Sequence, residues 1–193
     1  EALLATLDFG TPNAAVVEKA LEDSSYLVVI SAMETLFEID SVQAINKAEQ
    51  FKDDPNMELR LMCAELFALS GKPKYANFFN ALDEDLTGFD RISYYALLPI
   101  YVLNTEDEAI IDAAVPRLEK GALSKSAWYV RYYAIAGLQQ IEGYYASLSA
   151  DAKNAEDKQK YTNKKSGIAD VLNNVAANTR EDQLKMLLKN GYE

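Results

Sequence analysis

The sequence predicts an all-α fold, an α-solenoid of about four helix pairs with a C-terminal helical cap. Apolar residues recur at spacings of three and four along most of the chain, as on one face of a helix. The alternation with period two that is typical of strands is absent. The same helix frame also starts at residues 28, 59, 92 and 130. A spacing of roughly 30 to 40 residues is typical of helix-pair repeats.

Residues 54–71 show this frame most clearly. Asp54 and Pro55 mark a helix start, and the apolar residues after them fall on one wide face. These apolar residues are Leu59, Met62, Cys63, Leu66 and Phe67. The positions taken as equivalent in the four frames are Val28, Leu59, Ile92 and Val130. Each is followed after four positions by a small residue, which lets neighbouring helices approach closely, and after eight positions by a large apolar residue that fills the layer between them.

Each frame is interpreted as the second helix of a pair. The first helices are expected at residues 14–21, 42–51, 75–82 and 109–118. The helix-pair repeats are therefore assigned to residues 1–142. Residues 143–193 are assigned to the cap, because a solenoid otherwise exposes the apolar face of its last unit.

The cap is expected to hold a long polar helical region and a short final helix. The long region covers residues 147–178, and its continuity through Gly167 is left open. Asn178 and Thr179 are expected to cap the final helix, which Gly191 ends. At the other end, residues 1–9 resemble the end of a helix whose beginning is missing, which favours a piece of a longer polypeptide.

Charge and hydropathy restrict the class of partner. Lys and Arg number 19 and Asp and Glu number 30, so the formal net charge is −11. This sign disfavours nucleic acid and anionic membrane surfaces as partners. No stretch approaches the roughly 18 apolar residues of a membrane span, and a soluble protein is expected. The single cysteine, Cys63, leaves the compartment undecided, and it is interpreted as a small buried residue rather than as a reactive thiol.

The residues that carry common catalytic and metal-binding chemistry are missing. There is no His, which removes His-based metal sites, catalytic triads and His general bases together. No glycine-rich phosphate loop is present. The acidic runs at 83–85 and 106–108 do not match a calcium-binding loop. No catalytic residue, cofactor or metal ligand is therefore expected in this chain.

Aromatic residues crowd the second half of the chain and suggest a docking surface. The candidate interface residues are Tyr94, Tyr95, Trp128 and Tyr132. Tyr and Trp provide a large contact area at a low cost in conformational entropy. The alternative is that these rings fill the core between helix pairs. Trp128 lies beside an expected turn, and it is the best candidate for an exposed ring.

A second pattern pairs arginines with turn aspartates. Arg60 and Arg131 follow their frame positions directly, Arg91 is displaced by two, and Asp23 and Asp54 each precede a frame by five residues. The aspartates are expected to accept hydrogen bonds from the start of the next helix and from an arginine of a neighbouring unit. A row of arginines that binds an anionic partner is the alternative.

The stretch DPNMELRLMCAEL, echoed by DSSYLVVISAMETL and SAWYVRYYAIAGL, resembles the second helix of HEAT repeats over residues 12–142. A narrower likeness rests on ALEDSSYLVVISAMETLFEID, FFNALDEDLTGFDRISYY, LEKGALSKSAWYVRYYAIAGL and the lysine-rich tail. Together these segments look like the C-terminal region of bacterial zinc aminopeptidases of the aminopeptidase N family. The HExxH, downstream Glu and GxMEN motifs of the catalytic part of that family are absent here.

The narrower resemblance implies a non-catalytic helical domain that packs beside the catalytic domains of the same polypeptide and shapes substrate access. It would also imply an exported or periplasmic protein. The alternative is a free-standing HEAT-like scaffold that holds another protein on its concave face. Fold alone does not choose between the two.

Overall fold

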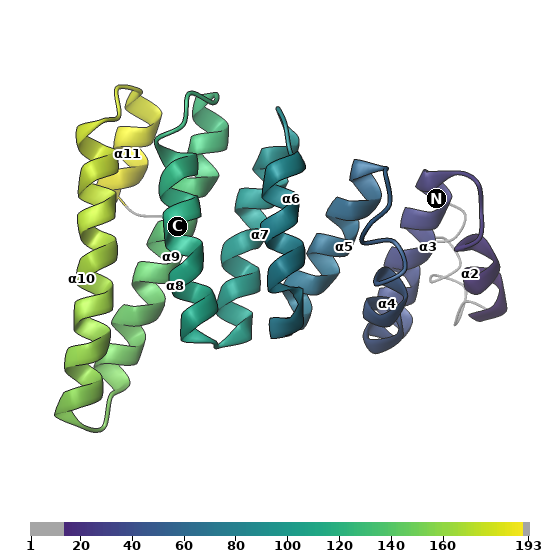
Figure 1. The fold of residues 1–193 in the computed structure, drawn as a ribbon, viewed down its shortest axis with the longest axis horizontal. Coiled ribbons are helices and arrows are strands. Elements are labelled where there is room, and N and C mark those ends of the chain that lie inside the picture. Colours follow the sequence, from purple (N-terminus) through teal and green to yellow (C-terminus); the bar gives the residue numbers. More distant parts are fainter. Residues whose placement is uncertain (1–13, 191–193) are drawn as a thin grey trace. The chain divides into compact units, whose positions relative to one another are not determined.

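The structure, a computed structural model, describes residues 14–190 and is all-α over that range, with no strand (Figure 1). The all-α prediction is confirmed. The chain divides into two compact units, residues 1–70 (unit 1) and 71–193 (unit 2). The helix end expected at residues 1–9 and the stop expected at Gly191 lie outside the described residues.

The described residues of unit 1 form four helices. Its helices are α2 (Ala14–Ala20), α3 (Tyr26–Ile39), α4 (Ser41–Ala48) and α5 (Met57–Ser70). Helix α3 packs against α2, α4 and α5, and α4 also packs against α5. The core holds apolar residues from all four helices, namely Val17, Val29, Ala32, Met33, Leu36, Ala44, Ile45, Ala48, Leu59, Met62, Cys63, Leu66 and Phe67.

Aspartates accept backbone hydrogen bonds next to the helix starts of unit 1, as predicted for Asp23 and Asp54. The Asp23 carboxylate accepts a hydrogen bond from the Ser25 N–H at 2.8 Å, and Asp54 accepts one from the Asn56 N–H at 2.7 Å. Asp40 caps α4 by accepting from the Gln43 N–H at 2.9 Å. Such contacts satisfy backbone donors that lack a partner within the helix.

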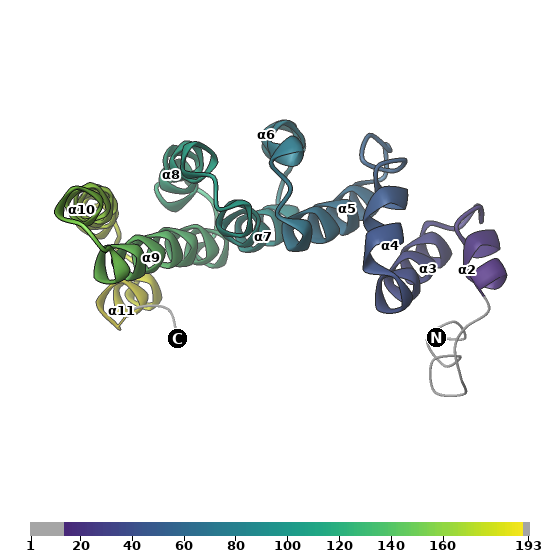
Figure 2. The ribbon, with the colours of Figure 1, turned by 90° about the horizontal axis from the view of Figure 1, so that it is seen from below.

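Unit 2 is built around its longest helix. Its elements are the 3-10 turn η2 (Pro73–Tyr75), α6 (Ala76–Asp85), α7 (Asp90–Thr105), α8 (Glu108–Ala122), α9 (Trp128–Asp151), α10 (Ala155–Ala177) and α11 (Asp182–Asn190). Helix α9 packs against α7, α8, α10 and α11. Figure 2 shows α6, α8 and α10 on one side of the layer that α7 and α9 form.

The helix frame that starts at Ile92 is wrong by two residues. Ile92 is only half-buried and Ile100 is exposed, whereas Tyr94, Leu98 and Val102 are buried. Apolar residues occur on several faces of α7, so their spacing does not fix which face is buried. In unit 1, Val28 is also only half-buried, while the next residue, Val29, is in the core.

The arginines give the correct register. The Arg91 Nε–H donates to the Leu86 carbonyl at 2.9 Å, and the Arg131 Nε–H donates to the Ala122 carbonyl at 2.8 Å. Both side chains thus reach back from the first turn of their helix to the segment before it. Arg91 is therefore the counterpart of Arg131, and the frame of α7 begins at Asp90.

A glycine sets the close approach of α7 and α8. A Cβ placed on Gly121 of α8 would lie 2.5 Å from Cζ of the Tyr95 ring of α7. Both residues are buried. Because no side chain separates the ring from the α8 backbone, the two helices pack at this short distance.

The C-terminal helices differ in detail from the sequence prediction. Helix α9 continues through residue 142, so no helix end marks the proposed start of the cap. Helix α10 begins after Asn154, whose side chain accepts from the Asp157 N–H, and it is continuous through Gly167. Asn178 is the C-cap of α10 rather than the N-cap of α11. Leu184 and Leu187 of α11 are buried, and Leu188 is half-buried.

Arg131 holds the connection between α10 and α11 against α9. Its Nη1–H donates to Glu181 Oε1 at 2.8 Å, its Nη2–H donates to Thr179 Oγ1 at 3.2 Å, and its Nε–H donates to the Ala122 carbonyl. Arg131 is 7% exposed and Thr179 is buried. One guanidinium therefore satisfies groups from two connections that lie far apart in the sequence.

We expect Arg131→Ala to lower the free energy of unfolding by about 2 to 3 kcal/mol, because buried acceptors lose their donor. Arg180→Ala is the matched control, since Arg180 is exposed. That change should alter stability by less than about 0.5 kcal/mol. Urea denaturation followed by the fluorescence of Trp128 measures both variants. Equal stabilities of the two variants would contradict the assigned role of Arg131.

A network of charges and phenols joins α8, α9 and α10. Lys160 Nζ lies 2.6 Å from Glu108 Oε1, and Lys164 pairs with both Glu108 and Asp112. The Tyr145 hydroxyl of α9 donates to Asp112 Oδ1 at 2.7 Å. The hydrogen bond from Lys160 is the main cause that lowers the pKa of Glu108. Because the ion pairs are partly exposed, they orient the helices more than they stabilise them.

Candidate protein-binding surface

Two of the four candidate interface residues are in the core. Tyr94 and Tyr95 are fully or almost fully buried in α7. Their rings contact each other edge to face at 5.3 Å, and Tyr95 also lies against Gly121 of α8. The prediction that these two rings form part of an exposed surface is therefore wrong. They serve the alternative purpose, filling the space between helices.

The other two residues reach the surface to different degrees. Trp128, the first residue of α9, is 43% exposed. Tyr132 is half-buried, and its ring contacts Tyr133 edge to face at 5.5 Å. Of the four residues, Trp128 is thus the one that clearly offers its ring to a partner, as its position beside a turn indicates.

Trp128 belongs to a cluster that we call the aromatic surface, made of Phe89, Trp128 and Tyr129. Phe89 precedes α7 and is 71% exposed. Its ring stacks on that of Tyr129, with centroids 5.4 Å apart and an interplanar angle of 3°. The Trp128 ring meets Tyr129 edge to face at 5.9 Å. The connection before α7 and the start of α9 therefore present three rings, of which Tyr129 contacts the other two.

The chain around these rings holds them in place. A hollow of about 430 Å³ lies beside them, with the buried Leu86 and Val130 among its lining residues. Gly88 has a φ of +54°, a backbone conformation that glycine adopts readily. The turn at Gly88 precedes Phe89, and the buried Leu86 anchors the segment on the other side.

Phe89 and Tyr129 were not selected from the sequence as interface residues. A local signal for Phe89 does exist, since it follows Thr87-Gly88 in a segment with the composition of a turn, outside any helix frame. Tyr94 and Tyr95, by contrast, lie within a helix frame, where burial is the common outcome. No local signal pairs Phe89 with Tyr129, because forty residues separate them (129 − 89).

Other chemistry is sparse in the described part of the chain. Within residues 14–190, no group of three or more His, Cys, Asp or Glu side chains is placed to hold a metal ion. No helix in that range has the length and apolar character needed to cross a bilayer. Cys63 is buried, its Sγ–H donates to the Ala48 carbonyl at 3.2 Å, and burial raises its pKa to about 12. The thiol is therefore protonated and unreactive in the folded protein.

Comparison of the sequence with known protein families gives no match. A search among curated proteins also finds no match.

Proposed function

We propose that this chain is a non-catalytic helical module of a larger zinc aminopeptidase-like polypeptide, and that it packs beside the catalytic body and shapes substrate access. The aromatic surface is the observation that supports docking. The resemblance of the sequence to the C-terminal region of that family supports the identity of the partner. The proposal includes an α-solenoid of helix pairs with a C-terminal cap. The packing of consecutive helices against each other within each unit supports this architecture.

The aromatic surface has the properties of a protein-binding site. Phe, Tyr and Trp are enriched at the centres of protein interfaces, where they lose contact with water. Burying apolar surface contributes about 25 cal/mol per Å², so an exposed ring such as Phe89 has much to gain from a partner. The stacking of Phe89 on Tyr129 fixes the ring before binding, which lowers the entropy cost of association.

A second candidate function is a free-standing HEAT-like scaffold that holds a peptide. A hollow of about 180 Å³ lies between α6, α7 and α8, and its lining is largely apolar. Phe79, Tyr101 and Ile110 contribute to its walls, and Arg117 provides a cation. Its size suits a single apolar side chain of a bound peptide rather than a whole ligand.

The reading frame that encodes this chain distinguishes the two functions. An HExxH motif in the same polypeptide, upstream of the chain, is expected for the peptidase module. A start codon next to Glu1 would overturn that function in favour of the free-standing scaffold. The isolated chain itself should release no amino acid from peptide substrates. One zinc ion retained per chain after dialysis would contradict the non-catalytic assignment.

Docking is tested by mixing the chain with the separately produced upstream domains. Trp128 is the only Trp of this chain. If the Trp residues of the upstream domains are replaced by Phe, the fluorescence emission of Trp128 alone reports whether the aromatic surface is buried in the complex. Phe89→Ser and Trp128→Ser should each weaken association at least about tenfold. Binding of the Trp128→Ser variant is measured by calorimetry, because this variant lacks the fluorescent residue. Met186→Ser, an exposed residue of α11, is the control and should change nothing. Unchanged association of the aromatic variants would refute the docking surface.

A further inference from the structure

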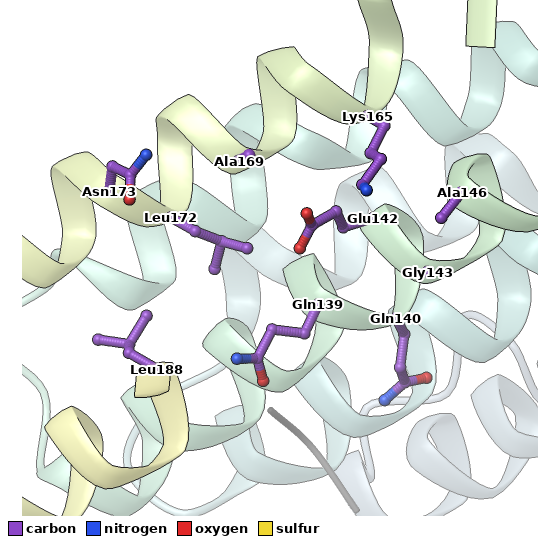
Figure 3. A pocket seen from close by; sticks show the side chains of 10 residues that line it. All are labelled: Gln139, Gln140, Glu142, Gly143, Ala146, Lys165, Ala169, Leu172, Asn173 and Leu188. Atoms are coloured by element: carbon purple, nitrogen blue, oxygen red, sulfur yellow. The ribbon is translucent and has the colours of Figure 1, made fainter. Parts of the chain in front are cut away.

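Another recess of unit 2 is larger and more polar than the hollow beside the aromatic surface. It lies between α9, α10 and α11 and has a volume of about 540 Å³ (Figure 3). Pockets of roughly 300 to 1,000 Å³ are typical of small-molecule sites. None of the aromatic surface residues lines it.

Opposite charges face this recess from two helices. Figure 3 shows the Glu142 side chain of α9 and the Lys165 side chain of α10 both extending into the space between the two helices. No ion pair joins either side chain to another residue in the described part of the chain. Both charges are thus available to a ligand that carries an anion and a cation close together.

An amide forms a fixed part of the pocket wall. Gln139 donates from Nε2 to the Leu187 carbonyl of α11 at 3.1 Å, which fixes the orientation of its side chain. Its Oε1 is buried and has no hydrogen-bond partner within residues 14–190. The Gln139 side chain is thus a fixed part of the wall, and its buried Oε1 is not offered to a ligand in the recess.

A glycine opens the recess. Gly143 lies within α9, and a Cβ placed on it would have no neighbouring heavy atom within 4 Å. Glycine inside a helix costs about 0.5 to 1 kcal/mol relative to alanine. A side chain at position 143 would fit without steric conflict. Because glycine has no side chain, the space that such a side chain would occupy is part of the pocket.

The remaining walls combine apolar side chains with the polar Gln140 and Asn173. Leu172 of α10 and Leu188 of α11 line the end of the recess beside Gln139, and Ala146 and Ala169 complete it with small side chains (Figure 3). A ligand of matching chemistry therefore has an aliphatic part next to its two charged groups.

We propose that this pocket binds a free α-amino acid with an aliphatic side chain. The ligand ammonium group pairs with Glu142, its carboxylate pairs with Lys165, and its side chain lies against Leu172 and Leu188. One carbon atom carries both charged groups of an α-amino acid, which matches a carboxylate and an ammonium that line the same pocket. The proposal is independent of the function of the aromatic surface.

Calorimetric titration of the whole chain with L-leucine tests this site. Leucine should bind saturably at millimolar or lower concentrations, and leucinamide and 4-methylpentanoate, which each lack one charge, should bind at least about tenfold more weakly. Glu142→Gln and Lys165→Met should weaken leucine binding by a similar factor. No saturable binding of leucine, or equal binding of all three compounds, would overturn the proposal.

Filling the pocket gives a test with a matched control. Gly143→Leu should abolish leucine binding while circular dichroism shows an intact helical fold. Gly167→Leu introduces the same side chain at a helix glycine outside the pocket, where a Cβ also meets nothing within 4 Å. This control should bind leucine as the unmodified chain does. Equal affinity of the Gly143 and Gly167 variants would place leucine elsewhere and refute the site.

Discussion

Unit 2 should unfold cooperatively when the pH rises one to two units above about 10, the pKa of an exposed tyrosine. Four of its tyrosines, Tyr94, Tyr95, Tyr101 and Tyr145, are buried and have raised pKa values. In the unfolded chain these phenols lose their protons near pH 10, whereas the folded chain retains them. The stabilisation is therefore complete below pH 10 and is lost as the pH rises toward the folded pKa values.

Burial is the largest cause of each shift. It raises the pKa of Tyr101 to about 12, and the Tyr101 hydroxyl donates to the Lys72 and Pro73 carbonyls. Tyr145 is shifted by burial and by its hydrogen bond to the Asp112 carboxylate. For Tyr94 the second cause is the negative charge of Asp83.

The expected loss is large compared with the stability of a domain. Each phenol that is protonated only in the folded state lowers the free energy of unfolding by about 1.4 kcal/mol per pH unit. Four such phenols lower it by about 5 kcal/mol per pH unit, against a typical total of about 5 to 15 kcal/mol. This change exceeds the expected effect of any single substitution described above.

Tyrosinate absorbance and far-ultraviolet circular dichroism, followed together in a base titration, measure this transition. Absorbance from the buried phenols should appear in the same step in which helical signal is lost. Tyr95→Phe is a suitable variant because it removes one phenol without removing a hydrogen bond that the structure assigns to that ring. Its pH slope should fall by about one proton. Complete ionisation of the tyrosines with helical signal intact would contradict the prediction.

Leu66→Ala should lower the free energy of unfolding of unit 1 by about 2 to 5 kcal/mol. Leu66 lies in α5 and is 5% exposed, among the core residues that α3 and α4 also supply. Truncation removes buried methyl and methylene groups and leaves a cavity that the surrounding helices fill only in part. Hydrogen exchange of residues 57–70, measured by mass spectrometry, reports the loss in the unit that carries the change.

Leu69→Ala provides the matched control in the same helix. Leu69 is 49% exposed, so the same chemical change should alter stability by less than about 1 kcal/mol. Similar effects at positions 66 and 69 would show that Leu66 does not face the core. The pair therefore separates burial from helix propensity, which is the same for both substitutions.

The frame of α5 could be predicted from the sequence because local signals agree there. Asp54 and Pro55 mark the start, the apolar residues fall on one face, and Leu59 and Phe67 are buried as expected. In α7 the apolar residues extend around the helix, so spacing alone placed Ile92 in the core. Arg91, which donates to the Leu86 carbonyl before α7, gives the correct register for this helix, whereas the spacing of the apolar residues does not.

The candidate sites depend on contacts that the sequence does not display. The guanidinium of Arg131 contacts Glu181, which lies fifty residues further along the chain. The rings of Phe89 and Tyr129 are in contact although forty residues separate them in the sequence. The recess around Gly143 requires three helices to be placed together. Composition could identify aromatic residues in this half of the chain, but only packing decides that Tyr94 is interior and Phe89 is exposed.

The contact between Gly121 and Tyr95 limits how the sequence can vary. Even alanine at position 121 would force its Cβ into the Tyr95 ring, and a smaller residue at 95 would leave a void. In descendants that keep this packing, the two positions should change together or remain fixed. If glycine is invariant at position 121, the cause is the short distance between the two helices. The glycine would then not indicate a ligand-binding site, because the space beside it is filled by the Tyr95 ring.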